Sequence, residues 1–363
     1  ELTLAVLQSH EEEELCSQLE SEGSLAGPSL AAVAMYRRLT LAEVEAGGLT
    51  LTRSQWLTWY VDEHVVGPAT DVALAQSLAS SRLTPLSSGC ASVADLYDET
   101  PYPPWHVAEA AGVKRVGVFE RLQRHYPHFQ KSREGESVLI AGCGSGHQVA
   151  VTLKMFDASR VVAVDLSAAA LAYADRRLRR AVAEDMHKVS LAVADITLLS
   201  LRHLGPLAPP AGFDLVCCGG VLHHTPDPTA TLKNLARLTA PGGVIQLATY
   251  SKINTQSWQP AAKSLVAELV GGVSSPPRDA AVRALRKAIA SIKDDQGKHV
   301  AVANALTSAP EFYSTAGVRD LVFHPLETSF ALPEVGEMAT SAGLDLVGVF
   351  FPTLDADAKW RQL

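Results

Sequence analysis

The amino-acid sequence predicts an α/β protein with a mostly parallel sheet, a helical segment before the sheet and a second helical segment after its fifth strand. Three observations support this prediction. From residue 137 onward, short apolar runs alternate with stretches of helical periodicity. The first apolar run ends in a glycine-rich turn, and residues 3 to about 95 show helical spacing with few strand signals. The 363 residues are enough for roughly two domains and one large core.

The amino-terminal part, residues 3 to about 95, is predicted to form a succession of helices. Ser29 is suited to cap a helix over residues 30–44, and a further helical pattern covers 52–66. The pattern ends within residues 98–105, where three prolines prevent regular helix and favour an extended backbone. We therefore expect a domain boundary close to residue 100.

The sheet is predicted from five apolar runs that are rich in Val, Ile and Leu. Because each run is continuously apolar, both faces of each strand should be buried, as in a parallel sheet with helices on either side. A helical stretch over about 256–293 then delays the remaining elements, which are a helix near 332–342 and a strand over 344–351. The five runs occupy residues 137–141, 160–164, 189–194, 213–218 and 243–249.

Charge and cysteine content exclude several classes of protein. Lys and Arg number 31 against 39 Asp and Glu, and the net charge of −8 lacks the positive field on which nucleic-acid binding relies. The 5 cysteines have no C-x-x-C spacing, so neither a disulfide framework nor a metal centre is expected. No apolar run reaches the roughly 18 to 20 residues of a membrane helix. We expect a soluble cytoplasmic protein without nucleic-acid or membrane partners, or an organellar one if a targeting peptide preceded Glu1.

The glycine-rich turn after the first strand carries the main functional signal. Gly142, Gly144 and Gly146 form a Gly-x-Gly-x-Gly pattern, in which a ligand can approach the backbone closely. His147 stands where a dinucleotide-binding turn has a small residue, which argues against NAD or FAD. Asp165 ends the second strand, where its carboxylate can accept from ribose hydroxyls. Each feature alone has another interpretation, a tight connection or a helix cap, but together they predict a nucleoside-binding site.

Further segments extend this pattern in the same order along the chain, and with them the sequence resembles the class I S-adenosylmethionine-dependent methyltransferases. The resemblance implies a Rossmann-like, mostly parallel sheet of about seven strands. It also implies S-adenosyl-L-methionine as cofactor and S-adenosyl-L-homocysteine as product. The matching segments are residues 194–196, 213–224, 241–243 and 343–349.

A closer resemblance is to a group of methyltransferases that are often fused to tetratricopeptide repeats, although this chain shows no repeat. Tyr102-Pro-Pro-Trp105 is similar to the Tyr-Pro-Arg-Trp of that group, and residues 311–324 match a second segment. Pro104 replaces the arginine of the group's motif. The acceptor of the group is therefore not carried over to this chain.

The resemblance assigns a part of the cofactor to each segment. The glycine turn should border the methionine part, Asp165 the ribose and Asp195 the adenine amino group. Tyr102 and Trp105 should close over cofactor or substrate, with a structural plug of the core as the alternative. The implied cofactor-binding residues are Tyr102, Trp105, Gly142, Cys143, Gly144, Gly146, Asp165, Leu166, Asp195, Ile196, Cys217 and Gly219.

Candidates for catalysis and acceptor binding follow the fourth and fifth strands. His223 and His224 have the right side chain for a general base, which a hydroxyl or protonated amine acceptor needs and a thioether does not. A structural hydrogen-bonding role is the alternative for both histidines, as core packing is for Tyr250. Four arginines within residues 176–180 are interpreted as a solvated helix face and not as an RNA-binding patch. The substrate-contacting candidates are His106, Tyr250, His324 and Glu327.

The predicted domains are a helical cap over 1–100, a cofactor-binding core over 101–251, a mainly helical insertion over the active site at 252–331 and the last part of the core at 332–363. We expect in-line methyl transfer to a small molecule, driven by alignment and desolvation. The first acceptor candidate is a thioether carboxylate, methylated on sulfur as in synthesis of dimethylsulfoniopropionate-type osmolytes. The alternatives are an O- or N-methyltransferase with a histidine base, an RNA or protein methyltransferase, and a non-catalytic cofactor-binding assembly module. A homodimer is compatible with the sequence.

Overall fold

The computed structural model describes residues 67–105, 114–125, 136–255, 258–270, 279–292 and 298–349. Several predictions lie outside these residues. They include the helices expected over 30–44 and 52–66, most of the amino-terminal cap, and the candidate His106.

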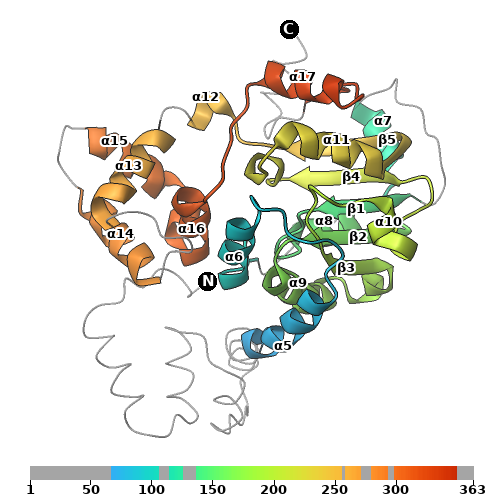
Figure 1. Cartoon of the computed structure of the whole chain (residues 1–363), viewed down its shortest axis with the longest axis horizontal. Coiled ribbons are helices and arrows are strands. Elements are labelled where there is room, and N and C mark those ends of the chain that lie inside the picture. The colour runs from blue at the N-terminus through green and yellow to red at the C-terminus, as the bar shows by residue number, and fades with distance from the viewer. Residues whose placement is uncertain are drawn as a thin grey trace, which may run out of the picture.

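A parallel sheet of five strands forms the centre of the described chain (Figure 1). Its strand order is β3-β2-β1-β4-β5, and all neighbouring pairs are parallel. Strands β2 and β3 lie on one side of β1, and β4 and β5 lie on the other, so the order reverses between β1 and β4. In open α/β sheets the carboxyl ends of the strands at such a reversal border the ligand site. The strands are β1 (Ser137–Ala141), β2 (Arg160–Asp165), β3 (Val189–Val193), β4 (Phe213–Gly219) and β5 (Thr239–Ala248).

Strands β1, β2 and β4 form because their apolar side chains are buried on both faces of the sheet, whereas β3 and β5 are only partly buried. In β1, Val138 and Ile140 belong to the hydrophobic cluster on one face. Leu139 and Ala141 belong to the cluster on the other face. Burying one such aliphatic side chain contributes roughly 1.5 to 3 kcal/mol. The prediction of a parallel sheet is confirmed for all five strands, but β5 begins at Thr239 and not at residue 243, and burial on both faces is wrong for it.

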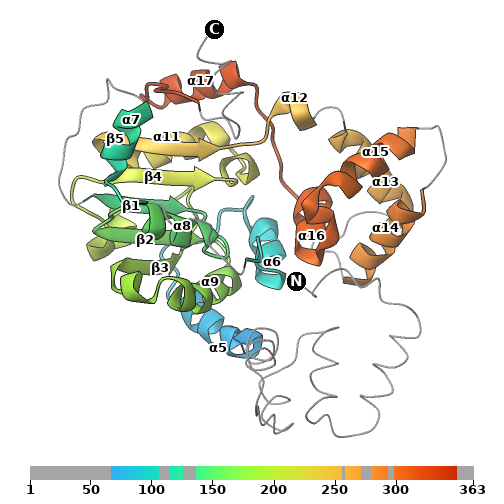
Figure 2. The ribbon, with the colours of Figure 1, turned by 180° about the vertical axis from the view of Figure 1, so that it is seen from behind.

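Helices cover the two faces of the sheet (Figures 1 and 2). Side chains of α8 (His147–Met155) and α9 (Ala168–Ala181) pack into one hydrophobic cluster, and α5 (Gly67–Ser80) lies against α9. The opposite cluster receives side chains from α10 (Leu201–Leu204), α11 (Pro228–Leu238) and α17 (Leu332–Ser341). Two further helices are α6 (Ala91–Glu99) and α7 (Val118–His125). None of the helices described here combines the length and apolar character needed to cross a bilayer.

The segment after β5 is helical, as predicted, and has a hydrophobic cluster of its own. In Figures 1 and 2 the strand arrows point towards α6 and α16, so the insertion lies beyond the carboxyl ends of the strands. The expectation that the insertion covers the active site stays a prediction. Its helices are α12 (Lys252–Thr255), α13 (Gln259–Val270), α14 (Asp279–Ser291), α15 (Lys298–Ser308) and α16 (Thr315–Phe323).

The strand predicted over residues 344–351 is not formed over 344–349, and the last two residues of that prediction lie outside the described chain. After α17, Gly343 turns the chain with a φ of +74°. Leu346 and Val347 are 52% and 48% exposed. An apolar run forms a strand only where a neighbouring strand pairs its backbone groups. Among the described residues the sheet therefore has five strands and not about seven.

Candidate functional site

The glycine-rich turn joins β1 to α8 at the carboxyl edge of the sheet. Gly142, Gly144 and Gly146 all have positive φ angles, which residues with a Cβ atom rarely adopt. A Cβ atom on Gly144 would lie 2.6 Å from the backbone oxygen of Tyr102. The turn therefore requires glycine, and the Tyr102 segment lies directly against it.

Asp165 ends β2 beside this turn, as predicted. Its Oδ2 accepts from the backbone N–H of Gly144 at 2.7 Å, and its Oδ1 accepts from the N–H of Ser167 at 2.9 Å. Burial raises the pKa of Asp165, and these backbone hydrogen bonds oppose that rise. Each carboxylate oxygen can accept about two hydrogen bonds. The side chain thus retains acceptor capacity next to the glycine turn, as binding of ribose hydroxyls requires.

Asp195, which follows β3, is held by the segment between α5 and α6. Its Oδ2 accepts from the N–H of Ser87 at 2.9 Å, and its Oδ1 accepts from the N–H of Thr197 at 2.8 Å. Burial alone would raise the pKa of Asp195, but the hydrogen bonds from Thr197 and Ser87 outweigh burial and the pKa is lowered. The carboxylate is therefore charged at neutral pH. The contribution of Ser87 could not be predicted, because 108 residues separate it from Asp195.

The segment Tyr102 to Trp105 is fastened to the glycine turn. The oxygen of Tyr102 accepts from the N–H of Ser145 at 3.2 Å, and the indole Nε1–H of Trp105 donates to the oxygen of Ser145 at 2.8 Å. Trp105 is buried in the cluster that α8 and α9 share, with the Arg177 guanidinium 5.2 Å from its ring. Of the two interpretations weighed for Trp105, the structure supports the plug. The side chain of Tyr102 instead interacts electrostatically with Asp320.

The remaining cofactor candidates make hydrogen bonds or packing contacts with other residues of the protein. The oxygen of Leu166 accepts from Arg82 at 3.1 Å, and the oxygen of Ile196 accepts from Asn234 at 2.8 Å. A Cβ atom on Gly219 would lie 3.1 Å from the side-chain oxygen of Gln148. Cys143 and Cys217 are buried thiols with raised pKa values, the latter to about 12, because of burial.

The acceptor-side cluster comprises the rings of His223, His224, His324 and Tyr250 and the carboxyl group of Asp320. Its members come from the ends of β4, β5 and α16. The ring centroids of His224 and His324 are 3.6 Å apart, and those of His223 and Tyr250 are 4.0 Å apart. The sequence-predicted candidates His223, His224, Tyr250 and His324 are thus brought together.

Backbone hydrogen bonds tie the chain after α16 to the ends of β4 and β5. The N–H of Thr328 donates to the oxygen of His223, and the N–H of Phe330 donates to the oxygen of Tyr250, both at 2.9 Å. Glu327 immediately precedes Thr328, and its carboxylate lies 3.3 Å from Lys263 Nζ. This predicted candidate is therefore close to the cluster but engaged with a residue of α13.

Burial makes all three histidines of the cluster weak bases. It lowers the pKa of His223 to about 3, of His224 to about 4 and of His324 to about 2, with neighbouring histidines as a further cause for His223 and His324. The rings are neutral at pH 7. A general base works best when its pKa is near the working pH. In this arrangement neither His223 nor His224 is well matched to the role of general base.

Asp320 of the cluster and Tyr97, which contacts it, were not among the predicted site residues. The Tyr97 hydroxyl donates to Asp320 Oδ1 at 2.6 Å, and the Tyr250 hydroxyl also donates to this carboxyl group. Burial raises the pKa of Asp320 to about 6. Asp320 and His324 are four residues apart, which places both side chains on one side of a helical turn. This spacing is the sequence pattern that could have indicated Asp320 as a site residue. Nothing in the sequence indicates the approach of Tyr97, which lies in α6.

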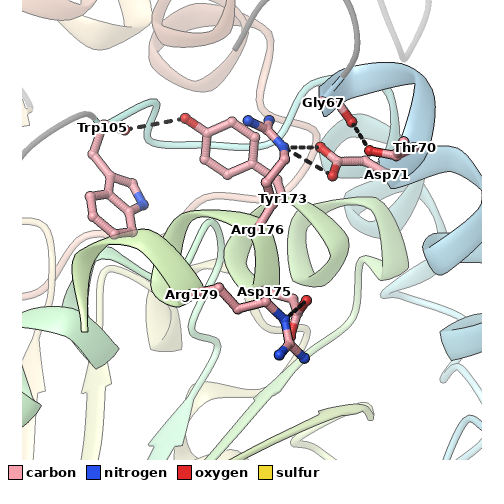
Figure 3. Close-up of polar contacts among 8 residues, drawn as sticks. All are labelled: Gly67, Thr70, Asp71, Trp105, Tyr173, Asp175, Arg176 and Arg179. Atoms are coloured by element: carbon pink, nitrogen blue, oxygen red, sulfur yellow. Dashed lines mark hydrogen bonds and ion pairs between the residues drawn. The ribbon is translucent and has the colours of Figure 1, made fainter. Parts of the chain in front are cut away.

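The arginine run on α9 has partners within the chain (Figure 3). The Nε of Arg176 lies 3.1 Å from both carboxylate oxygens of Asp71 on α5, and Arg179 pairs with Asp175 at 2.7 Å. Tyr173 on the same helix donates its hydroxyl to the oxygen of Trp105 at 3.3 Å. Arg176 therefore fastens α5 to α9. The expectation of a solvated helix face is wrong for Arg176, whose side chain is 11% exposed, and for Arg177, which is 5% exposed.

Comparison with known proteins bears on the central part of this site. Residues 139–245 match a methyltransferase domain. This range extends from β1 into β5 and contains the glycine turn, Asp165, Asp195 and the pair His223 and His224. The predicted methyltransferase domain is confirmed for this part of the chain. The closer grouping with repeat-fused methyltransferases stays a prediction.

Individual relatives match part of the chain. An uncharacterised protein of Synechococcus sp. is 32% identical over 170 residues, which cover 45% of this chain and 37% of that protein. A ubiquinone biosynthesis O-methyltransferase of Aromatoleum aromaticum is 31% identical over 118 residues, which cover 32% of this chain and 45% of that enzyme. The chain thus spans less than half the length of both relatives.

Among solved structures, PKMT2 from Rickettsia typhi in complex with AdoHcy aligns with a TM-score of 0.48 and 16% identity. The alignment covers 72% of this chain and 50% of that chain.

Proposed function

We propose that this protein is an S-adenosylmethionine-dependent methyltransferase that acts on a small polar acceptor. The observation that carries the proposal is the contact between the glycine turn and Asp165, at the point where the strand order of the sheet reverses. Backbone N–H groups and an acidic side chain at this point suit a cationic nucleoside cofactor. The methyltransferase domain matched by residues 139–245 supports the same conclusion.

The residues of the turn and its neighbours hold the cofactor in this proposal. Gly142 to Gly146 border the methionine part, Asp165 accepts from the ribose and Asp195 accepts from the adenine amino group. The chemistry that bound S-adenosylmethionine supplies is a methyl group on a sulfonium, which is a good leaving group. Trp105 and the Tyr102 segment exclude water from the glycine turn by their direct hydrogen bonds to Ser145.

In the proposed reaction, the acceptor atom forms a bond to the methyl carbon as the carbon–sulfur bond breaks. The electron pair of the broken bond would remain on sulfur, which would give S-adenosylhomocysteine, and a hydroxyl acceptor would release its proton to solvent water. Alignment and desolvation supply much of the rate in such a displacement. The acceptor-side cluster provides this environment, because His223 and His224 are buried, Tyr250 is half-buried, and the three residues follow strands β4 and β5.

The charges around the cluster favour a neutral acceptor over a carboxylate. The pKa of Tyr250 is raised by burial and then by the negative charges of Asp320 and Glu327. These groups would repel a thioether carboxylate, so the first acceptor candidate from the sequence is disfavoured. The similarity to ubiquinone biosynthesis O-methyltransferases supports a hydroxyl acceptor instead. We therefore propose methylation of oxygen on a small molecule.

The proposal is tested by following S-adenosylhomocysteine release from the full chain with separate panels of small hydroxyl compounds, amines and thioether carboxylates. We expect turnover with members of the hydroxyl panel. Turnover with thioether carboxylates alone would reverse the choice of acceptor. Turnover with RNA or protein alone would contradict a small-molecule acceptor.

A further inference from the structure

The acceptor-side cluster contains three potential metal ligands that come from two distant parts of the chain. One ligand atom from each of His224, Asp320 and His324 lies within 4.8 Å of the others, and all three residues are buried. We propose that these residues bind one divalent transition-metal ion. This inference differs from the sequence analysis, which predicted no metal centre because it considered cysteine spacing.

His224 is already oriented as a metal ligand. Its Nδ1 lies 2.8 Å from the backbone oxygen of Leu326, which can only accept, so Nδ1 carries the proton. The other nitrogen, Nε2, therefore has a free lone pair. Metal-binding histidines commonly donate their second ring N–H to a backbone carbonyl in this way, which fixes the tautomer and the ring orientation.

His324 supplies a buried nitrogen that has no protein partner among the described residues. The side chain is 5% exposed, and its Nε2 makes no hydrogen bond there. The N–H of Leu326 donates to its Nδ1 at the long distance of 3.2 Å. Because Nδ1 accepts in this bond, Nε2 carries the ring proton, and metal binding at Nε2 would move that proton to Nδ1 and break this one long hydrogen bond. Leaving a buried polar atom without a partner is unfavourable, and a metal ion would remove that cost.

Asp320 supplies the negative charge and has supporting hydrogen bonds. Tyr97 donates to its Oδ1 at 2.6 Å, Tyr250 donates to the same carboxyl group, and the charges of Glu327 and Glu311 act on it as well. Such partners orient a ligating carboxylate. A cation would be stabilised by this concentration of negative charge.

The donor set indicates the class of ion. Two imidazole nitrogens and one carboxylate oxygen suit zinc, iron(II) or cobalt(II), and leave coordination positions open. Ligand atoms around such an ion lie roughly 3 Å apart, so the stacked rings of His224 and His324 must turn towards a common point. If the proposed function also holds, an acceptor hydroxyl would bind beside this ion, which would compensate for the weakly basic histidines.

The proposal is tested by titrating the full-length, chelator-treated protein with cobalt(II) and recording visible absorption and calorimetric stoichiometry. We expect one site in the wild-type protein, and loss of that site in His324→Gln and Asp320→Asn. Tyr97→Phe removes only a supporting hydrogen bond and should weaken binding about 10-fold. The matched control is His187→Gln, since His187 is exposed and bonded only to the oxygen of Glu184 in the described chain.

Two results would overturn the metal site. One is the absence of stoichiometric cobalt uptake by the wild-type protein, which involves no variant and no question of folding. The other is retention of the site in folded His324→Gln and Asp320→Asn. Binding of S-adenosylhomocysteine, measured on the same samples without metal, reports separately on the proposed function. Failure of one proposal therefore leaves the other open to its own test.

Discussion

Gly144 shows how a single missing side chain shapes the site. A Cβ atom there would meet the Tyr102 oxygen at 2.6 Å, whereas a Cβ atom on Gly343, which also has a positive φ, would have no neighbour within 4 Å. Both Gly→Ala variants carry backbone strain of about 1 kcal/mol. We expect Gly144→Ala to lose about 2 kcal/mol more than Gly343→Ala in urea unfolding, because only it also displaces Tyr102. Equal losses would show that the segment is not packed on the turn.

Asp195 provides a residue-scale prediction about pH. Its pKa is lowered in the folded protein, so its stabilising effect is complete above the unfolded value of about 3.9 and disappears as the pH falls through the folded value. Asp195→Asn should therefore reduce the unfolding free energy by about 1.5 kcal/mol at pH 7. The difference from wild type should shrink as the pH approaches 3. A difference that grows in acid would contradict the assignment of a charged, hydrogen-bonded Asp195.

Site residues that belong to one continuous sequence motif could be predicted. Residues that reach the site from distant positions along the chain could not. The glycine turn and Asp165 are recognisable because strand, turn and helix follow one another directly. Asp320, Tyr97 and Ser87 reach the site through tertiary packing. For Asp320 and Tyr97, 223 residues of chain separate two hydrogen-bonded side chains.

At the scale of elements, the contact between α5 and α9 makes a prediction about the arginine run. The Arg176 and Asp71 side chains are 11% and 15% exposed, while the Arg179 side chain is 66% exposed. Breaking the less exposed pair with Arg176→Met should cost about 2 to 3 kcal/mol. Arg179→Met, the matched control, should cost about 0.5 kcal/mol or less. Urea unfolding measures both, and similar losses would mean that Arg176 does not fasten α5.

The central strands β1, β2 and β4 were predictable because a strand buried on both faces has a distinctive, continuously apolar sequence. The segment 344–349 carries a similar apolar pattern without forming a strand. Strand formation there depends on a pairing neighbour, which composition does not reveal. The helical nature of the insertion was predictable from periodicity, but its hydrophobic cluster and its approach to α6 depend on the packing of whole helices.

At the scale of the whole molecule, three parts of the chain meet over the carboxyl edge of the sheet. The segment 82–105 contacts the glycine turn and Asp195, and Tyr97 within it contacts Asp320 of the insertion. If the cofactor binds between this segment and the sheet, it should slow local opening there. We expect slower amide hydrogen exchange in 82–105 when S-adenosylhomocysteine is added, with 228–238 unchanged as the control. Equal protection of both regions would indicate a global effect instead.

The central claim is that the glycine turn and Asp165 form a cofactor site. Calorimetric titration of the full chain with S-adenosylhomocysteine tests it most directly, with Asp165→Ala compared against Asp185→Ala. Asp185 is a buried, ion-paired carboxylate that precedes β3, at the opposite edge of the sheet. The account predicts binding by the wild-type protein and by Asp185→Ala, and affinity about 100-fold weaker in Asp165→Ala. Unchanged affinity in folded Asp165→Ala would contradict it.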